Sequence, residues 1–150
     1  MDVLNQLFSN GILIAGICAW AAAQVLKTIT YAIVNRTLDI RRLLGDGGMP
    51  SAHSATVTAI AVATGFECGF DSPVFAVAIM LAFIVMHDAM GVRLETGKQA
   101  KILNDMIKMV YTEDMTPEEK LKEFVGHTPT QVLAGFVLGV IVDFVIFVVL

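Results

Sequence analysis

The chain has 150 residues, of which 56% are hydrophobic and 16% are charged, and its mean hydropathy is +0.73. Soluble domains carry roughly 25% charged residues, so the composition excludes an ordinary soluble globule, and so much apolar surface excludes a disordered chain. The net charge of −4 gives no electrostatic support for a nucleic-acid partner. We therefore expect an all-α, multi-pass membrane helical bundle that forms a single domain over residues 1–150.

Four stretches of the sequence approach the roughly 20 apolar residues that a helix needs to span the hydrocarbon core of a bilayer. These predicted spans are residues 7–26, 53–70, 73–92 and 129–150. Only Asp2 is charged ahead of the first one, whereas a cleavable signal peptide opens with a basic region. We therefore expect residues 7–26 to be retained, which gives about four transmembrane helices.

The connection between the third and fourth predicted spans carries an amphipathic pattern. Its apolar residues recur at helical spacing among charged ones, and they are Ile102, Leu103, Met106, Ile107 and Val110. This spacing predicts an amphipathic helix at the membrane interface. The polar, acidic stretch that follows, residues 111–123, is expected to be a loop or a short helix that starts near Thr116.

The basic residues are confined to two connections, one between the first two predicted spans and one between the last two. They are Lys27, Arg36, Arg41, Arg42, Arg93, Lys98, Lys101, Lys108, Lys120 and Lys122, which are all 10 Lys and Arg of the chain. Loops rich in Lys and Arg stay in the cytoplasm. Both connections, and any site built on them, are therefore expected at the cytoplasmic face, with both chain ends outside.

Small residues recur at helical spacing within the spans, in the rows Gly11/Ala15/Ala19, Ala55/Ala59/Ala63 and Gly135/Gly139. Such rows let helix backbones approach closely in lipid, so they predict a compact bundle. Cys18 and Cys68 lie in apolar stretches. We expect both to be small buried residues without a disulfide or a metal.

Residues 47–54, Gly-Gly-Met-Pro-Ser-Ala-His-Ser, stand directly before the second predicted span. Pro50 fixes a turn, and Ser51 or Ser54 can cap the helix. The N–H groups and the positive dipole end at a helix start also make an anion site, and His53 lies beside it. The pattern therefore allows a structural interpretation, capping, and a functional one.

Residues 126–131, Gly-His-Thr-Pro-Thr-Gln, open the fourth predicted span. Thr128 as N-cap, Pro129 at the first helical position and Gln131 three residues after the cap predict a capping box. Capping does not explain His127, which stands just ahead of this helix on the same predicted membrane face as His53.

Ionisable residues also stand at the cytoplasmic ends of the other two spans. Lys27 and Arg93, taken singly, are typical topology anchors, whereas Asp88 inside a span normally has a partner or a function. Together, two His, an Arg and a Lys around two helix N-termini are what phosphoryl transfer without a metal or other cofactor needs. Cations neutralise the phosphate oxygens, one His attacks phosphorus, and the other protonates the leaving alkoxide.

These motifs resemble those of the type 2 phosphatidic acid phosphatase family, membrane lipid phosphatases related to vanadium haloperoxidases. Pro50-Ser51-Ala52-His53 is similar to the family's Pro-Ser-Gly-His motif, and His127 resembles the end of its third motif. The stretches 47–51, 88–93 and 126–127 match the small divergent branch of the family most closely. The likeness covers residues 24–139, and the four predicted spans correspond to the catalytic core helices of larger six-span members.

The resemblance implies a metal-independent phosphatase that acts on a membrane lipid phosphate. It makes His127 the nucleophile, which carries a phosphohistidine, and His53 the general acid. The phosphate-binding residues that it implies are Lys27, Arg36, Ser51, the amide of Ala52, and Arg93. Asp88 and Gln131 are the supporting residues that it implies.

The sequence departs from the family pattern at three places. Val92 replaces the Ser that precedes Arg93, and residues 94–126 intervene before His127 where the family has five. Gln131 stands where the family has an Asp that orients the nucleophile, and a neutral amide stabilises an imidazolium less than a carboxylate does. In the first motif Val34-Asn35 replaces Arg-Pro, and Arg36 is the nearest substitute.

Two other functions agree with the same sequence. One is a catalytically weak member that binds lipid phosphates or serves as a membrane scaffold, which the departures at Gln131 and 94–126 favour. The other is a small transporter, for which Asp143 is the only charge deep in the fourth span. Phosphatidylglycerophosphate, phosphatidic acid and isoprenyl phosphates all suit the phosphatase hypothesis, and the sequence leaves open whether the chain forms a homo-oligomer.

Overall fold

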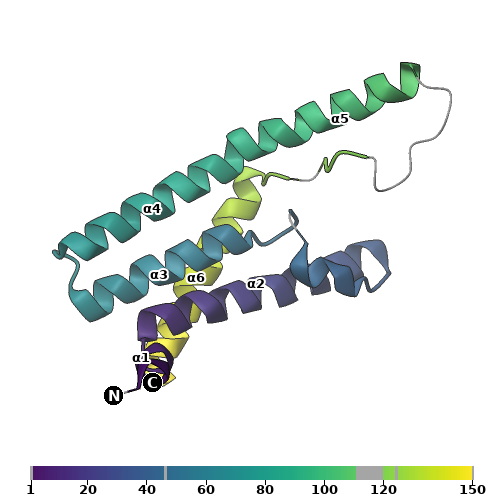
Figure 1. Cartoon of the computed structure of the whole chain (residues 1–150). Helices are drawn as coiled ribbons and strands as arrows, with labels where there is room; N and C mark the ends of the chain where they lie inside the picture. The colour runs from purple at the N-terminus through teal and green to yellow at the C-terminus, as the bar shows by residue number, and fades with distance from the viewer. Residues whose placement is uncertain (1, 46, 111–119, 124, 150) are drawn as a thin grey trace.

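The computed structural model describes residues 2–45, 47–110, 120–123 and 125–149, and this part of the chain is helical without strands. The helices are α1 (Val3–Phe8), α2 (Gly11–Asn35), the 3-10 helix η1 (Ile40–Leu44), α3 (Ala52–Cys68), α4 (Pro73–Met90), α5 (Val92–Val110) and α6 (Pro129–Val149). Helix α1 and the end of α6 lie at the same end of the bundle (Figure 1). The expected all-α bundle is confirmed.

Three of the four predicted spans agree with observed helices. Residues 53–70, 73–92 and 129–150 correspond to α3, α4 and α6 to within two residues at each end. The prediction for the first span was wrong at both ends, because α2 begins at Gly11 and runs on to Asn35. The Asn10 side chain caps the start by accepting a hydrogen bond from the Leu13 N–H, and Arg36, at φ 53°, ends the helix in the left-handed region.

Within the described residues, three helical stretches are long and apolar enough to cross a membrane: Gly11–Asn35, Pro73–Val110 and Pro129–Phe147. Helix α3 has 17 residues, which gives a length of about 25 Å, a little under the 30 Å of a typical hydrocarbon core. It lies at the centre of the bundle and packs against α2, α4 and α6. The sequence-based count of four spans thus stays a prediction.

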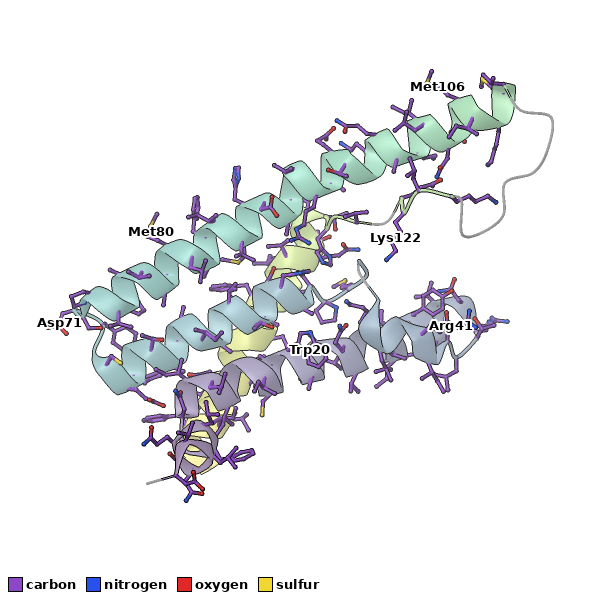
Figure 2. All side chains as sticks on the ribbon, viewed as in Figure 1. Trp20, Arg41, Asp71, Met80, Met106 and Lys122 are labelled. Carbon is purple, nitrogen blue, oxygen red and sulfur yellow. The ribbon has the colours of Figure 1, made fainter. Side chains whose placement is uncertain are left out.

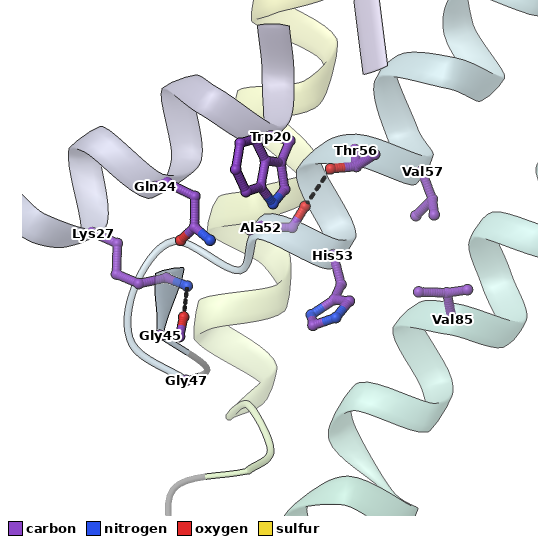
Figure 3. Close-up of a pocket in the computed structure, with 10 residues that line it drawn as sticks. All are labelled: Trp20, Gln24, Lys27, Gly45, Gly47, Ala52, His53, Thr56, Val57 and Val85. Carbon is purple, nitrogen blue, oxygen red and sulfur yellow. Dashed lines mark hydrogen bonds between the residues drawn. The ribbon is translucent and has the colours of Figure 1, made fainter. Parts of the chain in front are cut away.

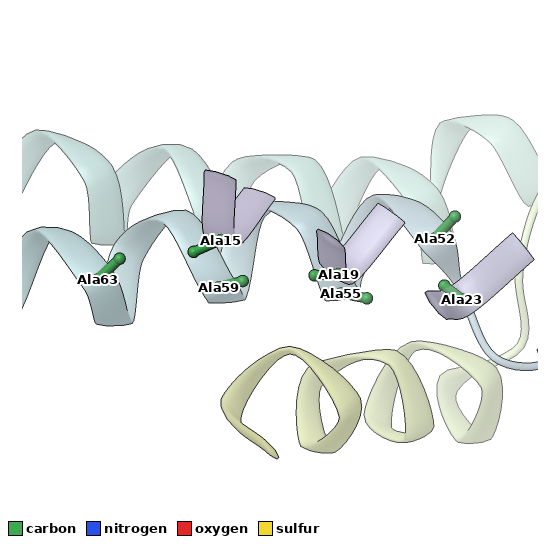
Figure 4. Packing of buried hydrophobic residues seen from close by; sticks show 7 residues of the cluster. All are labelled: Ala15, Ala19, Ala23, Ala52, Ala55, Ala59 and Ala63. Carbon is green, nitrogen blue, oxygen red and sulfur yellow. The ribbon is translucent and has the colours of Figure 1, made fainter. Parts of the chain in front are cut away.

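The helices meet through alanines and glycines. The buried cluster consists of Ala15, Ala19, Ala23, Ala52, Ala55, Ala59 and Ala63, so the expected small-residue rows of α2 and α3 face each other (Figure 4). On α6, a Cβ at Gly135 would collide with the Ser51 carbonyl oxygen, and one at Gly139 with that of Ala55. Backbone contact this close is how helices associate in lipid, where apolar burial supplies no driving force.

Large apolar side chains point away from the bundle, as Met80 does on α4 (Figure 2). Cys18 and Cys68 are free, and the prediction that they are buried was wrong, because both are exposed. Cys18 precedes Ala19 by one position and therefore lies off the stripe of small residues that faces α3. Cys68 is the last residue of α3.

Helix α5 continues α4 beyond a break at Gly91 and keeps roughly its direction (Figure 1). Helix α5 contains the expected amphipathic segment, which is therefore confirmed as helical, and the helix begins earlier than expected, at Val92. Its position at a membrane interface stays a prediction. The chain returns beside α5, where the Asn104 amide group bonds the Leu121 main chain and the Glu123 carboxylate. Most of the predicted loop 111–123 lies outside the described residues.

Candidate active site

The side chain of Lys27 is enclosed by the loop that precedes α3. Only 4% of the residue is exposed, and its Nζ donates a hydrogen bond of 3.1 Å to the Gly45 carbonyl. Gly48 has φ +84°, and a Cβ there would lie 3.0 Å from Lys27 Cγ, so the loop can close over the lysine stem only with glycine at this position. Lys27 was expected at the end of a span, but it lies inside α2, two turns before Asn35.

Ser51 caps α3, as one of the two sequence interpretations predicted. Its Oγ accepts hydrogen bonds from the N–H and the hydroxyl of Ser54, and its own N–H donates to the Gln131 carbonyl at 3.0 Å. Ser51 is 0% exposed, and while its side chain caps α3, its main chain connects α3 to α6. The next residue, Ala52, lines a cavity and has its N–H at the first helical position, where no helix carbonyl precedes it.

His127 is anchored at both its main chain and its ring. Its N–H donates to the Ala89 carbonyl on α4 at 3.0 Å, and its Nδ1 lies 3.3 Å from Gln131 Oε1. The same Oε1 accepts the Thr128 N–H at 3.0 Å, while the Gln131 N–H donates to Thr128 Oγ1, so the expected capping box is confirmed. Because this oxygen can only accept, Nδ1 carries the proton and Nε2 keeps its lone pair in the neutral ring.

The two histidines face each other. The ring centroids of His53 and His127 are 6.0 Å apart, with an angle of 64° between the ring planes. His53 belongs to the first turn of α3, and His127 directly precedes the capped start of α6. The N-terminal ends of these two helices lie side by side, which brings the rings together. The structure thus unites two residues that are 74 positions apart in the sequence.

Burial lowers the pKa of His127 below its usual value near 6.5. The hydrogen bond with Gln131 and the Gly48 main chain act against this effect, while the positive charges of Lys27 and His53 add to it. The low pKa keeps the imidazole neutral around pH 7, which is the form that has a nucleophilic lone pair.

A cavity of about 430 Å³ adjoins His53, Lys27 and Ala52. Figure 3 shows the Gln24 amide of α2 in this cavity, one turn before Lys27. Its Oε1 is buried and has no hydrogen-bond partner in the part of the chain that the structure describes. Sequence reasoning missed Gln24 as a site residue. The available signal was a polar side chain inside an apolar helix, which is costly in lipid and therefore points to a function.

We call Gly47 and Gly48, which precede α3, the glycine loop. A second cavity, of about 380 Å³, lies on the other side of this loop. Gly47 borders both cavities, and Gln131 and Gly126 line the second one beside two lysines of α5, Lys98 and Lys101. These lysines were counted in the sequence only as topology signals. The fold places them beside the site because α5 and the returning chain form one wall of this cavity.

The insertion 94–126 does not separate Arg93 from His127. Gly126 packs directly on the backbone of Arg93 and Leu94, so the chain returns to the place where it left. The side chain of Arg93 is 44% exposed, and its Nε donates to Asp88 Oδ2 at 2.8 Å. Asp88 thus has the partner that a carboxylate near a helix end was expected to have.

Arg36 lies outside this group of residues. It ends α2 in the left-handed region, is exposed, and lines none of the cavities around the histidines. Its implied role as a phosphate ligand therefore finds no geometric support. Over the described ranges, no group of three or more His, Cys, Asp or Glu side chains gathers where it could hold a metal ion.

Comparisons with known proteins agree with the motifs. The model of the Divergent PAP2 family, the branch related to type 2 phosphatidic acid phosphatases, matches residues 8–142. The chain is also 36% identical to a Bacillus subtilis (strain 168) protein named "Uncharacterized membrane protein YuiD", over 94% of this chain and 96% of that one. No solved structure matches. With this family model covering the histidines, the glycine loop and the helices that hold them, the chain belongs to the Divergent PAP2 family.

Proposed function

We propose that the protein is a phosphatase for membrane lipid phosphates that works without a metal and through a phosphohistidine on His127. The observation that carries this proposal is the pair of facing imidazoles, 6.0 Å apart, beside the buried Lys27 and the start of α3. One imidazole has its lone pair freed by the Gln131 hydrogen bond, and the other borders a cavity large enough for a head group. Family membership supports the same reaction class.

In the first step, His127 Nε2 attacks phosphorus and forms an N–P bond. The P–O bond to the lipid breaks, its electron pair goes to the leaving oxygen, and protonated His53 donates its proton there. In the second step, neutral His53 takes a proton from water, whose oxygen attacks phosphorus. The N–P bond then breaks and returns its electron pair to His127, which releases inorganic phosphate.

The positive groups that neutralise the phosphate are Lys27 and the N-terminus of α3. Lys27 is buried in a region of low dielectric, where its charge acts more strongly than it would in water. The free N–H of Ala52 and the positive end of the α3 dipole also favour a bound anion at this position. Gly47 borders both cavities and the Gly48 main chain contacts His127, so a phosphate reaches Nε2 when these two glycines move aside.

The shape of the first cavity favours a lipid. Helices α2 and α4 both pack on α3 and, in the residues described, not on each other. Trp20 of α2 and Val85 of α4 line the cavity from opposite sides, with Val57 of α3 between them (Figure 3). These apolar walls lead from His53 toward the lipid-facing surface, so they can hold the first carbons of an acyl or isoprenyl chain.

The direct test is phosphate release from a panel of lipid phosphates by the detergent-solubilised protein. Phosphatidylglycerophosphate, phosphatidic acid and an isoprenyl phosphate should be tried with EDTA and with vanadate. We expect release that survives EDTA, since Lys27 and α3 supply the positive charge, and that vanadate blocks, since it mimics pentacoordinate phosphorus. A strict requirement for Mg²⁺ would contradict the mechanism, and binding of these lipids without release would favour the scaffold function.

We further propose that the site faces the cytoplasm, as the distribution of Lys and Arg indicates. Cysteines can be introduced at Asp71, between α3 and α4 (Figure 2), and at Lys120, on the segment that returns beside α5. The predicted topology puts these two positions on opposite sides of the membrane. Cys18 and Cys68 are exposed and should first be replaced by serine. In intact cells an impermeant maleimide should label position 71 and leave position 120 unlabelled. Labelling of position 120 alone would show that the protein has the opposite orientation in the membrane.

Replacing Gln131 with glutamate should shift the acid limb of the pH–rate profile upward by about one unit. The side chain is isosteric, so a carboxylate oxygen takes the place of Oε1 at 3.3 Å from His127 Nδ1 and favours the protonated ring. The rate above pH 7 should rise several-fold, because the same charge stabilises the phosphohistidine cation. Gln99→Glu adds the same charge on the exposed face of α5 and should leave the profile unchanged. An unshifted acid limb in the Gln131 variant would show that the acid limb does not report the titration of His127.

A further inference from the structure

The end of the bundle away from the histidines holds another cavity, which two acidic residues line. Its volume is about 370 Å³, and residues of α2, α3 and α6 line it. The same end of the bundle holds both ends of the chain (Figure 1). Glu67 from the last turn of α3 and Asp143 from α6 supply its charged side chains. The mechanism proposed above uses neither residue.

Asp143 is a buried carboxylate with one oxygen that no described residue bonds. Only 3% of the residue is exposed, and its Oδ2 has no hydrogen-bond donor among the described residues. A charged or polar group in this setting costs several kcal/mol if it stays unpaired, so it normally has a partner or a function. Among the described residues, no lysine or arginine lines this cavity.

Glu67 lines the same cavity, and its carboxylate lies against the backbone of Gly11. A Cβ on Gly11, at the start of α2, would collide with Glu67 Oε1, so the glycine makes room for the carboxylate between the two helices. Two carboxylates therefore share one cavity, with Asp143 in its buried part and Glu67 at its more exposed end.

The rest of the lining is apolar and partly aromatic. Phe66 and Phe147 stack with ring centroids 4.9 Å apart, and Ile146 lies beside them. A metal ion such as Ca²⁺ takes six to eight oxygen ligands, which this lining does not offer. An organic cation fits better, since aromatic rings attract a cation near their faces and the carboxylates accept its N–H groups.

We propose that this cavity binds a primary ammonium group, such as the head group of an aminophospholipid or a soluble amine. An –NH₃⁺ group has three donors and can bond both carboxylates at once, which satisfies Asp143 Oδ2. A trimethylammonium group has no N–H and leaves that oxygen unpaired. The site therefore distinguishes ethanolamine head groups from choline head groups.

The test titrates the detergent-solubilised full chain with dihexanoyl phosphatidylethanolamine and with the matched phosphatidylcholine, and native mass spectrometry gives the bound fraction. We expect the ethanolamine lipid to bind at least about tenfold more tightly. Free ethanolamine forms a third arm. Binding as tight as that of the lipid identifies a soluble amine as the ligand, and much weaker binding identifies the lipid. Equal affinities for the ethanolamine and choline lipids would overturn the proposal.

Two variants remove the charge at each end of the cavity. Asp143→Asn keeps the shape of the buried side chain and should weaken ethanolamine-lipid binding about tenfold or more, and Glu67→Gln should do the same at an exposed position that tolerates change. Asp71→Asn removes a charge from the loop beside the cavity and should bind like the unchanged protein. An equal loss in all three variants, or no loss in the first two, would contradict the proposal. The readout needs no phosphatase activity, so the result is independent of the function proposed above.

Discussion

Replacing His127 with alanine is expected to lower phosphate release by about 10⁴-fold or more, the size of loss seen when a covalent nucleophile is removed. The variant lacks the only protein atom proposed to bond phosphorus, so the phosphoenzyme should disappear as well. Brief incubation with ³²P-labelled substrate, followed by an alkaline quench that preserves phosphohistidine, measures both quantities together. Release at the unchanged rate would show that His127 is not the nucleophile and that family membership does not extend to this role.

The buried ring of His127 also contributes to packing, so two further variants separate chemistry from folding. His127→Asn keeps a polar side chain of similar reach and should be as inactive as the alanine variant while it retains the thermal stability of the unchanged protein. His87→Ala removes an exposed ring that stacks on Phe83, outside the site, and should leave release unaffected. Inactivity in all three variants would indicate a general loss of structure.

Replacing His53 with alanine should slow the release of lipid phosphates by about 10² to 10⁴-fold, the range typical of a lost general acid. The loss should depend on the leaving group. A lipid alkoxide needs a proton as it departs, whereas p-nitrophenolate leaves without one, so p-nitrophenyl phosphate should lose far less.

The comparison of these two substrates in the same variant is its own control, because misfolding would slow both equally. The phosphoenzyme should still form from p-nitrophenyl phosphate and should persist longer, since His53 also activates the water of the second step. Equal losses for the two substrates would contradict the assignment of His53 as the general acid.

The fold was largely predictable because its signals are local. Apolar runs of the right length marked α3, α4 and α6, and the small-residue rows marked the faces through which α2 and α3 meet. The end of α2 was missed because residues beyond Leu26 become polar, although the helix continues to Asn35. Hydropathy indicates which residues are apolar enough to lie in lipid. The end of a helix is set instead by the last backbone hydrogen bond of the helix.

The candidate site was predictable where capping residues and histidines are neighbours in the sequence. His53 follows the Ser51 cap, and His127 precedes the box formed by Thr128 and Gln131. What the sequence could not show depends on contacts between distant segments. The bond from the His127 N–H to Ala89 and the position of Gln24 in the cavity both follow from how the helices pack.

A core built from alanine and glycine reverses the usual sensitivity of a protein to substitution. In most domains the damaging change removes volume from the interior, whereas here little volume exists to remove. The harmful direction is enlargement, since one added methyl group on α6 at Gly135 pushes against the main chain that carries Ser51 and thus shifts His53. The bulky residues of the outer surface can exchange among themselves as long as they stay apolar. Variation should therefore be broad on the outside of this bundle and restricted by size along its central seam.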